Sequence, residues 1–298
     1  MTLRILQFGA TGQVGTALLR AAGERDVLIE ALSRRAVDLR DAKAISDTIH
    51  DARADVVVNA AAFTGVDLAE EQEADALAVN GAAPGAMAAA CATKGAPLIH
   101  LSTDYVFDGA SDTPYLETDA PNPINAYGRT KLAGEVAVAD AFQSAGPLSY
   151  AVLRTSWVYS PYGRNFVKTM LRLGREKGGV RVVDDQRGAP TSAGDIASAV
   201  LAVAEKLVGD DGARAGVYHY TSSGEISWAD FAAAIFEEAS VTASVERIPT
   251  TEYPTPAPRP LRSSLNCEKI ENVFGVCPKP WRDSLTPVIA ALREDEGA

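Results

Sequence analysis

Short runs of apolar residues alternate with alanine-rich stretches of helical spacing through the first half of the chain. The apolar runs cover residues 4–8, 27–32, 55–60, 97–102 and 151–156. The helical stretches cover residues 15–22, 42–52, 75–93 and 126–139. Runs that are apolar throughout, without alternating polar residues, are typical of strands in a parallel sheet covered on both faces. These repeated βα units predict an α/β fold with a doubly wound parallel sheet.

The pattern becomes less regular after residue 157. It predicts helices over 165–177, 192–207 and 228–239, a short strand over 180–183, and a strand over 216–220 that returns to the sheet. A proline-rich stretch, residues 254–260, lies between segments that look structured. We expect it to be an ordered loop that lines a pocket, and a disordered linker is the alternative.

Composition narrows the class of protein. The chain has 298 residues, 47% of them apolar, which is enough for one large α/β domain and a smaller one. The net charge of −11 argues against nucleic acid or an anionic membrane as a partner, because both need basic patches. No signal peptide and no run of about 18 apolar residues is apparent, so no membrane span is expected.

Cysteine usage points to a reducing compartment. The three cysteines, Cys91, Cys267 and Cys277, form no CxxC pair and have no histidine at ligand spacing. A disulfide framework and a zinc site are therefore not expected. We expect a cytoplasmic protein.

Three glycines follow the first expected strand, in the segment ILQFGATGQVG over residues 5–15. Gly9 would make the tight turn, Gly12 would let backbone N–H groups approach a pyrophosphate, and Gly15 would let the helix pack on the strand. A glycine-rich turn alone is not specific, but a strand before it and an Ala/Leu helix after it are the context that dinucleotide binding requires. The sequence therefore predicts a Rossmann-type domain.

Two domains are expected on this basis. The dinucleotide-binding domain would cover residues 1–160, with residues 190–221 returning to it. A smaller C-terminal α/β domain, formed by residues 161–189 and 222–298, would bind the substrate.

The end of the second strand indicates which dinucleotide is bound. It reads Ser33-Arg34-Arg35, without the acid that would accept the ribose hydroxyls of NAD. Ser33 and Arg34 offer a hydrogen bond and a positive charge to the 2′-phosphate of NADP, so we expect NADPH to be preferred. The alternative is that the arginines lie in a solvated loop, which leaves NADH open.

Farther along, Asp38 is placed to accept from the adenine amino group. After the third strand comes the segment NAAAFT over residues 59–64. Its small residues would let the cofactor lie across the sheet, with Ala62, Phe63 and Thr64 flanking the nicotinamide.

The catalytic prediction rests on Tyr127 and Lys131, with Thr103 at the end of the preceding strand. Residues four apart lie on one helix face, so the ammonium can lie near the phenol and favour its ionised form. A YxxxK pair alone occurs by chance on many solvated helices, but its combination with the glycine motif and Ser102-Thr103 is specific. Thr103 would hydrogen-bond the substrate carbonyl, Tyr127 would donate a proton, and the nicotinamide would deliver hydride. Lys131 would support Tyr127 and the ribose, and no metal is needed.

Several longer segments resemble one family. They are LSTDYVFDG over 101–109, NAYGRTKLAGE over 125–135, RTSWVY over 154–159, DQRGAPT over 185–191 and the proline-rich 254–260. In order and content they resemble the dTDP-4-dehydrorhamnose reductase family of extended short-chain dehydrogenases. The resemblance spans nearly the whole chain.

The resemblance implies reduction of the 4-keto group of a dTDP-linked 6-deoxyhexulose, giving dTDP-L-rhamnose. It implies that Thr103, Asp104 and Trp157 contact the sugar nucleotide. Some members of the family have been associated with Mg²⁺ and with dimers, so both stay open here, although no residues form a recognisable metal site. The cofactor contacts that it implies are Gly12, Gln13, Val14, Asp38, Leu39, Ala62, Phe63, Thr64, Leu101, Tyr127 and Lys131.

The residues also indicate a pocket independently of the resemblance. Trp157 follows the carboxyl end of a strand, which is the ligand edge of such a sheet, and its ring could pack on the apolar face of a sugar. A buried core tryptophan is the alternative. Arg259 and Lys168 could pair with the diphosphate, and a surface position is the alternative for each.

Three other functions are weighed. A sugar-nucleotide 4,6-dehydratase shares the Tyr–Lys pair but reads Thr-Asp-Glu after the strand, where this chain has Tyr105. A 4-epimerase does not resemble the 101–109 segment. A non-catalytic NADP-binding regulatory subunit of the methionine adenosyltransferase type uses the same fold, and the retained Thr103, Tyr127 and Lys131 favour an enzyme over it.

Overall fold

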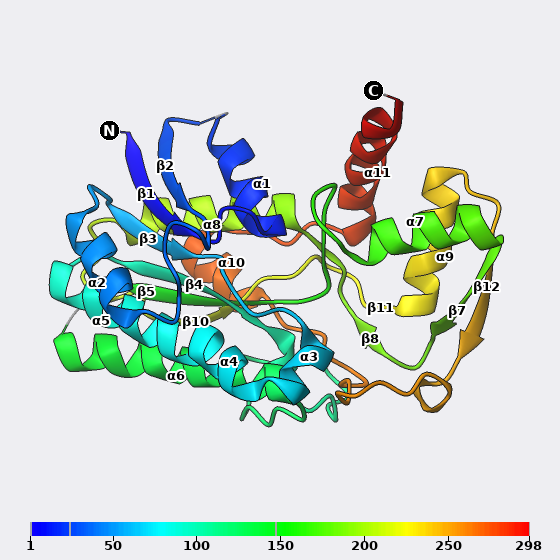
Figure 1. Cartoon of the computed structure of the whole chain (residues 1–298), viewed down its shortest axis with the longest axis horizontal. Helices are drawn as coiled ribbons and strands as arrows, with labels where there is room; N and C mark the ends of the chain where they lie inside the picture. Colours follow the sequence, from blue (N-terminus) through cyan, green and yellow to red (C-terminus); the bar gives the residue numbers. More distant parts are fainter. Residues whose placement is uncertain (1, 24, 147, 298) are drawn as a thin grey trace.

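A six-stranded, fully parallel sheet forms the centre of the larger part of the molecule (Figure 1). The computed structural model describes residues 2–23, 25–146 and 148–297, the last three of these as backbone alone. The strands run in the order β10-β5-β4-β3-β1-β2. Their bounds are Leu3–Phe8 (β1), Val27–Leu32 (β2), Val56–Asn59 (β3), Leu98–Thr103 (β4), Tyr150–Thr155 (β5) and Gly216–His219 (β10). The predicted doubly wound sheet is confirmed.

Helices cover both faces of this sheet. One face carries α1 (Gln13–Ala22), α8 (Ala193–Leu207) and α10 (Glu268–Phe274), and the other carries α2 (Ala42–Asp51), α5 (Ala83–Lys94) and α6 (Ala126–Ala145). Neighbouring strand residues point to opposite faces, so Ile5 packs beneath α1 and α8 while Leu6 packs toward α2 and α5. Both environments are apolar, which is why these strands read as unbroken apolar runs.

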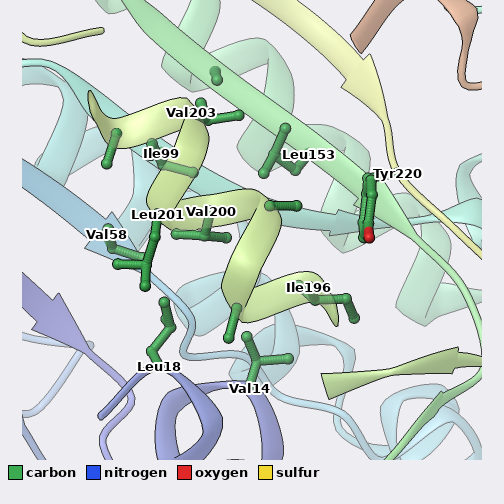
Figure 2. Close-up of a cluster of buried hydrophobic side chains, with 14 of the residues drawn as sticks. Val14, Leu18, Val58, Ile99, Leu153, Ile196, Val200, Leu201, Val203 and Tyr220 are labelled. Carbon is green, nitrogen blue, oxygen red and sulfur yellow. The ribbon is translucent and has the colours of Figure 1, made fainter. Parts of the chain in front are cut away.

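Figure 2 shows the core between α1, α8 and the sheet. Side chains from the two helices meet side chains from three strands there, and all of those labelled are buried. They are Val14 and Leu18 of α1, Ile196, Val200, Leu201 and Val203 of α8, Val58, Ile99 and Leu153 of the strands, and Tyr220 just after β10. The close fit of α1 on this core sets the position of the glycine turn that precedes it.

A second group of elements packs around its own apolar core, seen at the right of Figure 1. The core is formed mainly by α7, α9 and α11, with short strand pairs beside it. The bounds are Phe166–Lys177 (α7), Trp228–Ala239 (α9), Trp281–Gly297 (α11), Gly179–Val183 (β7) paired with Ser244–Ile248 (β12), Arg187–Gly188 (β8) paired with Ile226–Ser227 (β11), and Val158–Tyr159 (β6) paired with Thr191–Ser192 (β9). In contrast to its neighbours in sequence, α10 packs Ile270 and Phe274 into the core of the large sheet. The expected domain boundaries stay a prediction.

The helix predicted over residues 75–93 is divided in the structure. It consists of α4 (Glu73–Leu77), a π-helical turn η1 (Ala78–Ala82) and α5, preceded by α3 (Val66–Glu71). By length and hydropathy the run Glu73–Lys94 is long enough to cross a membrane. However, 44% of its apolar window is buried, and Met87 and Cys91 pack in the sheet core, so it has the position of a core helix.

Candidate active site

The glycine turn between β1 and α1 is as tight as the sequence indicates. Gly9 has a φ of +93°, and a Cβ there would lie 2.6 Å from the Ala61 backbone nitrogen. At Gly15 a Cβ would lie 1.9 Å from the carbonyl oxygen of Gly9. At Gly12, the N-cap of α1, a Cβ would lie 3.8 Å from its nearest neighbour, so there is open space beside the N-terminus of the helix. This cradle fits a pyrophosphate bound at a helix N-terminus.

The two residues after Gly12 have side chains that are already engaged. The Oε1 atom of Gln13 accepts from Ser160 at 2.8 Å and from Asn165 at 3.0 Å, which ties the glycine turn to the segment after β6. Val14 is buried in the sheet core. Backbone groups are therefore what these residues have to offer a phosphate.

At the end of β2, Arg34 is exposed and has no ion-pair partner among the described residues. Asp38 is held by Arg40, with the closest approach at 2.7 Å, and that guanidinium lowers the pKa of the carboxyl to about 2. Leu39 packs on the edge of the sheet core. An ionised Asp38 keeps its capacity to accept a hydrogen bond from an adenine amino group, and Arg34 remains available to a 2′-phosphate.

The segment Ala62-Phe63-Thr64 is held in place by a residue that the sequence reasoning missed. Asn80, in η1, accepts from the Phe63 N–H at 2.8 Å and donates to the Phe63 carbonyl at 3.1 Å. Its amide also reaches Thr130 on α6 at 3.2 Å. A fully buried asparagine in an alanine-rich helix is the signal that could have identified it.

Thr103 and Asp104 lie together at the carboxyl end of β4. The Thr103 hydroxyl donates to Asp104 Oδ1 at 3.0 Å and accepts from the Tyr105 N–H at 3.2 Å. Asp104 Oδ2 is buried without a hydrogen-bond partner among the described residues. Burial raises the pKa of Asp104 to about 7. This carboxyl therefore has unused hydrogen-bonding capacity next to the threonine.

Tyr127 stands beside Thr103 because the start of α6 is pressed against the end of β4. Asn125 caps the helix by accepting from the Gly128 N–H at 2.8 Å, and a Cβ at Gly128 would lie 2.1 Å from the Tyr105 carbonyl oxygen. The ring of Tyr105 meets that of Tyr127 edge-on, with 5.8 Å between centroids. Burial raises the pKa of Tyr127 to about 12, while the Thr103 hydroxyl acts to lower it.

Lys131 is directed differently from our expectation. Its Nζ donates to the Leu101 carbonyl at 2.6 Å and lies 3.3 Å from His100 Nε2, and the Nδ1 of that histidine lies 3.0 Å from Asn59 Nδ2. The backbone carbonyl and the imidazole thus engage the amine, and the phenol of Tyr127 keeps a raised pKa. Asn59 and His100 were not anticipated, although each is a polar residue inside an apolar run and therefore needs a buried partner.

One helical turn beyond Lys131, a buried ion pair lies under the site. Arg154 on β5 binds Glu135 with Nε and Nη2, at distances from 2.6 to 3.1 Å, and both side chains are only 4% exposed. Ser102, next to Thr103 on β4, donates to the same carboxylate. The pair thereby joins α6, β4 and β5.

Trp157 has a φ of +46°, unusual for a bulky residue and a mark of local strain at the sheet edge. Its indole stacks on Trp228 of α9, with 3.5 Å between ring centroids, and packs against Gly188, where a Cβ would lie 2.7 Å from the ring. Trp228 therefore covers one face of the indole.

The proline-rich stretch is held against the start of α6 and against α3. Asn125 donates to the Pro258 carbonyl at 2.9 Å, and Ala257 is fully buried. Arg259 pairs with Asp67 through two nitrogens, at 2.8 and 2.9 Å. Lys168 donates to the Pro161 carbonyl at 3.0 Å. Both cations considered for a diphosphate thus have partners within the chain.

Taken together, the phenol of Tyr127 and the hydroxyl of Thr103 lie side by side at the carboxyl end of β4, and the amine of Lys131 lies one helical turn farther along α6. No group of three or more His, Cys, Asp or Glu side chains among the described residues is arranged to hold a metal ion. The arrangement can bind a carbonyl oxygen and give it a proton.

Comparison with known proteins agrees with this geometry. The family model described as RmlD substrate binding domain matches residues 3–294. A dTDP-4-dehydrorhamnose reductase of Sinorhizobium fredii is 45% identical over 295 residues, covering 97% of this chain and 98% of that protein. The dTDP-4-dehydrorhamnose reductase structure from Clostridium acetobutylicum has a TM-score of 0.91 at 36% identity, covering 98% of this chain and 100% of that one. The corresponding Bacillus anthracis structure, solved in complex with NADP, has a TM-score of 0.90 at 32% identity, covering 97% of this chain and 99% of that one.

Proposed function

The chain belongs to the RmlD substrate binding domain family, and from that premise we propose that it is an NAD(P)H-dependent oxidoreductase acting on a sugar nucleotide. The reaction is reduction of the 4-keto group of a dTDP-6-deoxyhexulose, which gives dTDP-L-rhamnose. The observation that carries the proposal is the pairing of Tyr127 with Thr103 at the carboxyl end of β4, in a chain whose β1–α1 turn is a tight glycine turn. A relative with this reductase name, 45% identical over nearly the full chain, supports the substrate.

In the proposed mechanism the chain positions a ketone and supplies a proton. Thr103 donates a hydrogen bond to the substrate carbonyl, which polarises it, and Tyr127 gives its phenolic proton to the oxygen as negative charge develops there. NAD(P)H, when bound, supplies the hydride. Lys131 orients the ribose and assists Tyr127. Asp104, with its buried free oxygen, binds a sugar hydroxyl, and Trp157 borders the sugar.

The cofactor residues fit a dinucleotide in three groups. The turn and the start of α1, from Gly9 to Val14, take the pyrophosphate through backbone N–H groups. Ser33 and Arg34 take the 2′-phosphate, with Asp38 and Leu39 at the adenine. Ala62, Phe63, Thr64 and Leu101 line the nicotinamide side. The described residues lack a donor set for Mg²⁺, so no step is routed through a metal.

The direct test is the decay of NADPH absorbance when the dTDP-4-keto-6-deoxy sugar is added. Tyr127→Phe should bind NADPH normally and lose about 10²- to 10⁴-fold in kcat, the usual contribution of a positioned acid. Tyr150→Phe, at the far end of β5, is the matched control and should keep full activity. Undiminished turnover in Tyr127→Phe would assign proton donation to another group.

Cofactor preference has its own test. Arg34→Ala should lower kcat/KM with NADPH by about 10- to 100-fold, the loss expected for one hydrogen bond to a charged group, and should leave the NADH value unchanged. Arg53→Ala, exposed and distant, is the control. Equal losses with both cofactors would remove Arg34 from 2′-phosphate recognition.

A regulatory subunit that binds NADP without turnover is the second candidate, since it would use the same fold. A folded sample that binds NADPH but does not oxidise it with the keto sugar would favour that function.

We also propose a cytoplasmic homodimer, because the free cysteines suit a reducing compartment and the family resemblance suggests dimers. Light scattering of the purified protein tests the oligomeric state.

A further inference from the structure

Trp157 has a strained backbone at the ligand edge of the large sheet. It and Ser240 are the only residues other than glycine with a positive φ in the described part of the chain. Ser240 ends α9, where a left-handed residue is usual. Trp157 ends no helix, and it follows Thr155, whose register partner on β4 is Thr103. The strain therefore lies beside the proposed site, and strain of this kind concentrates at functional sites.

Both faces of the Trp157 indole are covered. The ring of Trp228 lies parallel to it, with 3.5 Å between centroids and 6° between planes, which covers one face. A Cβ on Gly188 would lie 2.7 Å from Cε2, 2.8 Å from Nε1 and 3.0 Å from Cζ2 of the indole. Cε2 is the nearest atom although it lies between the other two, so Gly188 approaches over the ring and not from its rim. No Trp228 atom is among the three nearest, so Gly188 covers the opposite face.

The rim of the indole is what Trp157 can offer a ligand. The side chain is half-buried, and its Nε1–H has no acceptor among the described residues. An indole N–H only donates, so an oxygen atom of a sugar is a matching partner. Stacking of the apolar face of a sugar on the ring, as considered from the sequence, would require Trp228 or Gly188 to move away.

Trp228 is itself held in place from two sides. It is the first residue of α9, whose N-cap Ser227 accepts from the Asp230 N–H at 3.1 Å. Phe166, at the start of α7, packs on its ring with 4.5 Å between centroids. Trp228 and Phe166 pack on the smaller apolar core, whereas Trp157 follows a strand of the large sheet. The stack therefore lets the smaller group of elements fix a side chain at the edge of the large sheet.

We propose that Trp228 is a positioning residue for the sugar site, which holds Trp157 in its left-handed conformation so that the indole presents its rim and Nε1–H to an oxygen of the sugar. This inference rests on the proposed function, because it takes the ligand to be the dTDP-linked sugar. Without the stack the strained backbone of Trp157 relaxes, and the conformation that binds the sugar becomes a minor one. Binding then weakens in proportion to the fraction of molecules that keep this conformation.

The first experiment observes the indole N–H signals by ¹H–¹⁵N correlation, without turnover. The chain has three tryptophans, and the third, Trp281, lies against Phe231, so single substitutions assign the signals. The Trp157 N–H proton lies within the ring current of Trp228, so its signal should be shifted upfield. It should stay upfield in Trp228→Phe and move downfield in Trp228→Leu. A Trp157 signal that does not respond to Trp228→Leu would overturn the proposal.

The same spectra locate the contact on the ligand. Adding dTDP-L-rhamnose, the product of the proposed reaction, should move the Trp157 N–H signal of the wild type, whereas dTDP alone should leave it in place. Equal shifts with the two ligands would refute the contact with the sugar, because the nucleotide alone would then account for them.

The second experiment separates binding from chemistry. Trp228→Leu should raise KM for the keto sugar by about 5- to 100-fold, the effect of a strained conformation that is no longer held. Its kcat should stay unchanged, because the contact is lost equally in the ground state and in the transition state. Trp228→Phe, which still stacks, should restore most of the affinity, and Gly188→Ala, which presses on the other face of the ring, should raise KM as well. Trp281→Phe is the matched control and should change neither constant.

The outcomes distinguish this inference from the proposed function. If the wild type reduces the keto sugar and a folded Trp228→Leu protein keeps the wild-type KM, Trp228 is not a positioning residue. A fall in kcat without a change in KM would equally refute the positioning role. If the wild type does not reduce the keto sugar, the proposed function fails and the contact with the sugar fails with it, even when an upfield Trp157 signal confirms the stack.

Discussion

The buried ion pair between Glu135 and Arg154 makes a prediction that can be worked through in numbers. The Glu135 side chain is 4% exposed, and its carboxylate binds the Ser102 hydroxyl and two nitrogens of the Arg154 guanidinium. An Arg154→Met variant would keep the hydroxyl and lose the guanidinium. Removing one partner of a buried pair costs about 3–5 kcal/mol, because the other charge is left uncompensated.

The size of the chain converts this cost into a melting shift. Unfolding entropy is about 2.1 cal/mol/K per residue, or roughly 0.6 kcal/mol/K for 298 residues. Arg154→Met should therefore lower Tm by about 5–8 °C, measured by differential scanning calorimetry. Arg172→Met is the matched control, because the Arg172–Glu176 pair is 58% and 54% exposed and such pairs contribute less than about 1 kcal/mol.

A double variant separates two effects: the loss of attraction between Glu135 and Arg154, and the penalty of leaving the buried carboxylate of Glu135 without a partner. Arg154→Met with Glu135→Leu removes both charges, so it should regain at least about half of the lost stability despite leaving the Ser102 hydroxyl without a partner. If the double variant were as unstable as the sum of the two single variants, the penalty of an unpaired buried carboxylate would not be the cause. If the Tm of Arg154→Met equalled that of the wild type, the ion pair would contribute nothing to stability.

Two further predictions concern the glycine turn and the buried aspartate. Gly15→Ala puts a methyl group 1.9 Å from the Gly9 oxygen, so it should destabilise the fold by about 1–3 kcal/mol. It should also weaken NADPH binding, measured by a fluorescence titration. Gly194→Ala is the control and should have neither effect, because its methyl group would lie 3.9 Å from the nearest atom. Burial raises the pKa of Asp104 to about 7 from 3.8, so the folded state holds a proton that the unfolded state has lost, and wild-type stability should fall as pH rises through this range. The free energy of unfolding of Asp104→Asn, measured by urea unfolding at pH 4 to 8, should not show this fall. If the free energies of unfolding of the two proteins changed in parallel with pH, the raised pKa of Asp104 would be contradicted.

The resemblance to the reductase family placed the expected site residues by position, and the structure shows why spacing alone was not enough. The YxxxK spacing predicted a phenol and an ammonium side by side, because i and i+4 share a helix face. In the structure the Leu101 carbonyl and His100 take the amine, and both come from β4, a different element. No pattern within α6 could have shown this. The sandwich of Trp157 against Trp228 likewise depends on a partner 71 positions away.

What the sequence determines by itself is the set of local structures. Unbroken apolar runs specify strands buried on two faces. Three glycines at fixed spacing specify a tight turn, in which a Cβ would clash at Gly9 and at Gly15. The parallel sheet and the cofactor cradle can therefore be predicted from the sequence. The tertiary structure decides which buried polar atoms meet. Asn59, His100 and Lys131 lie on three elements, and only the packing of these elements brings their buried polar atoms within 3.0 to 3.3 Å of one another. Such pairings join distant residues, so they depend on the three-dimensional fold and not on local periodicity.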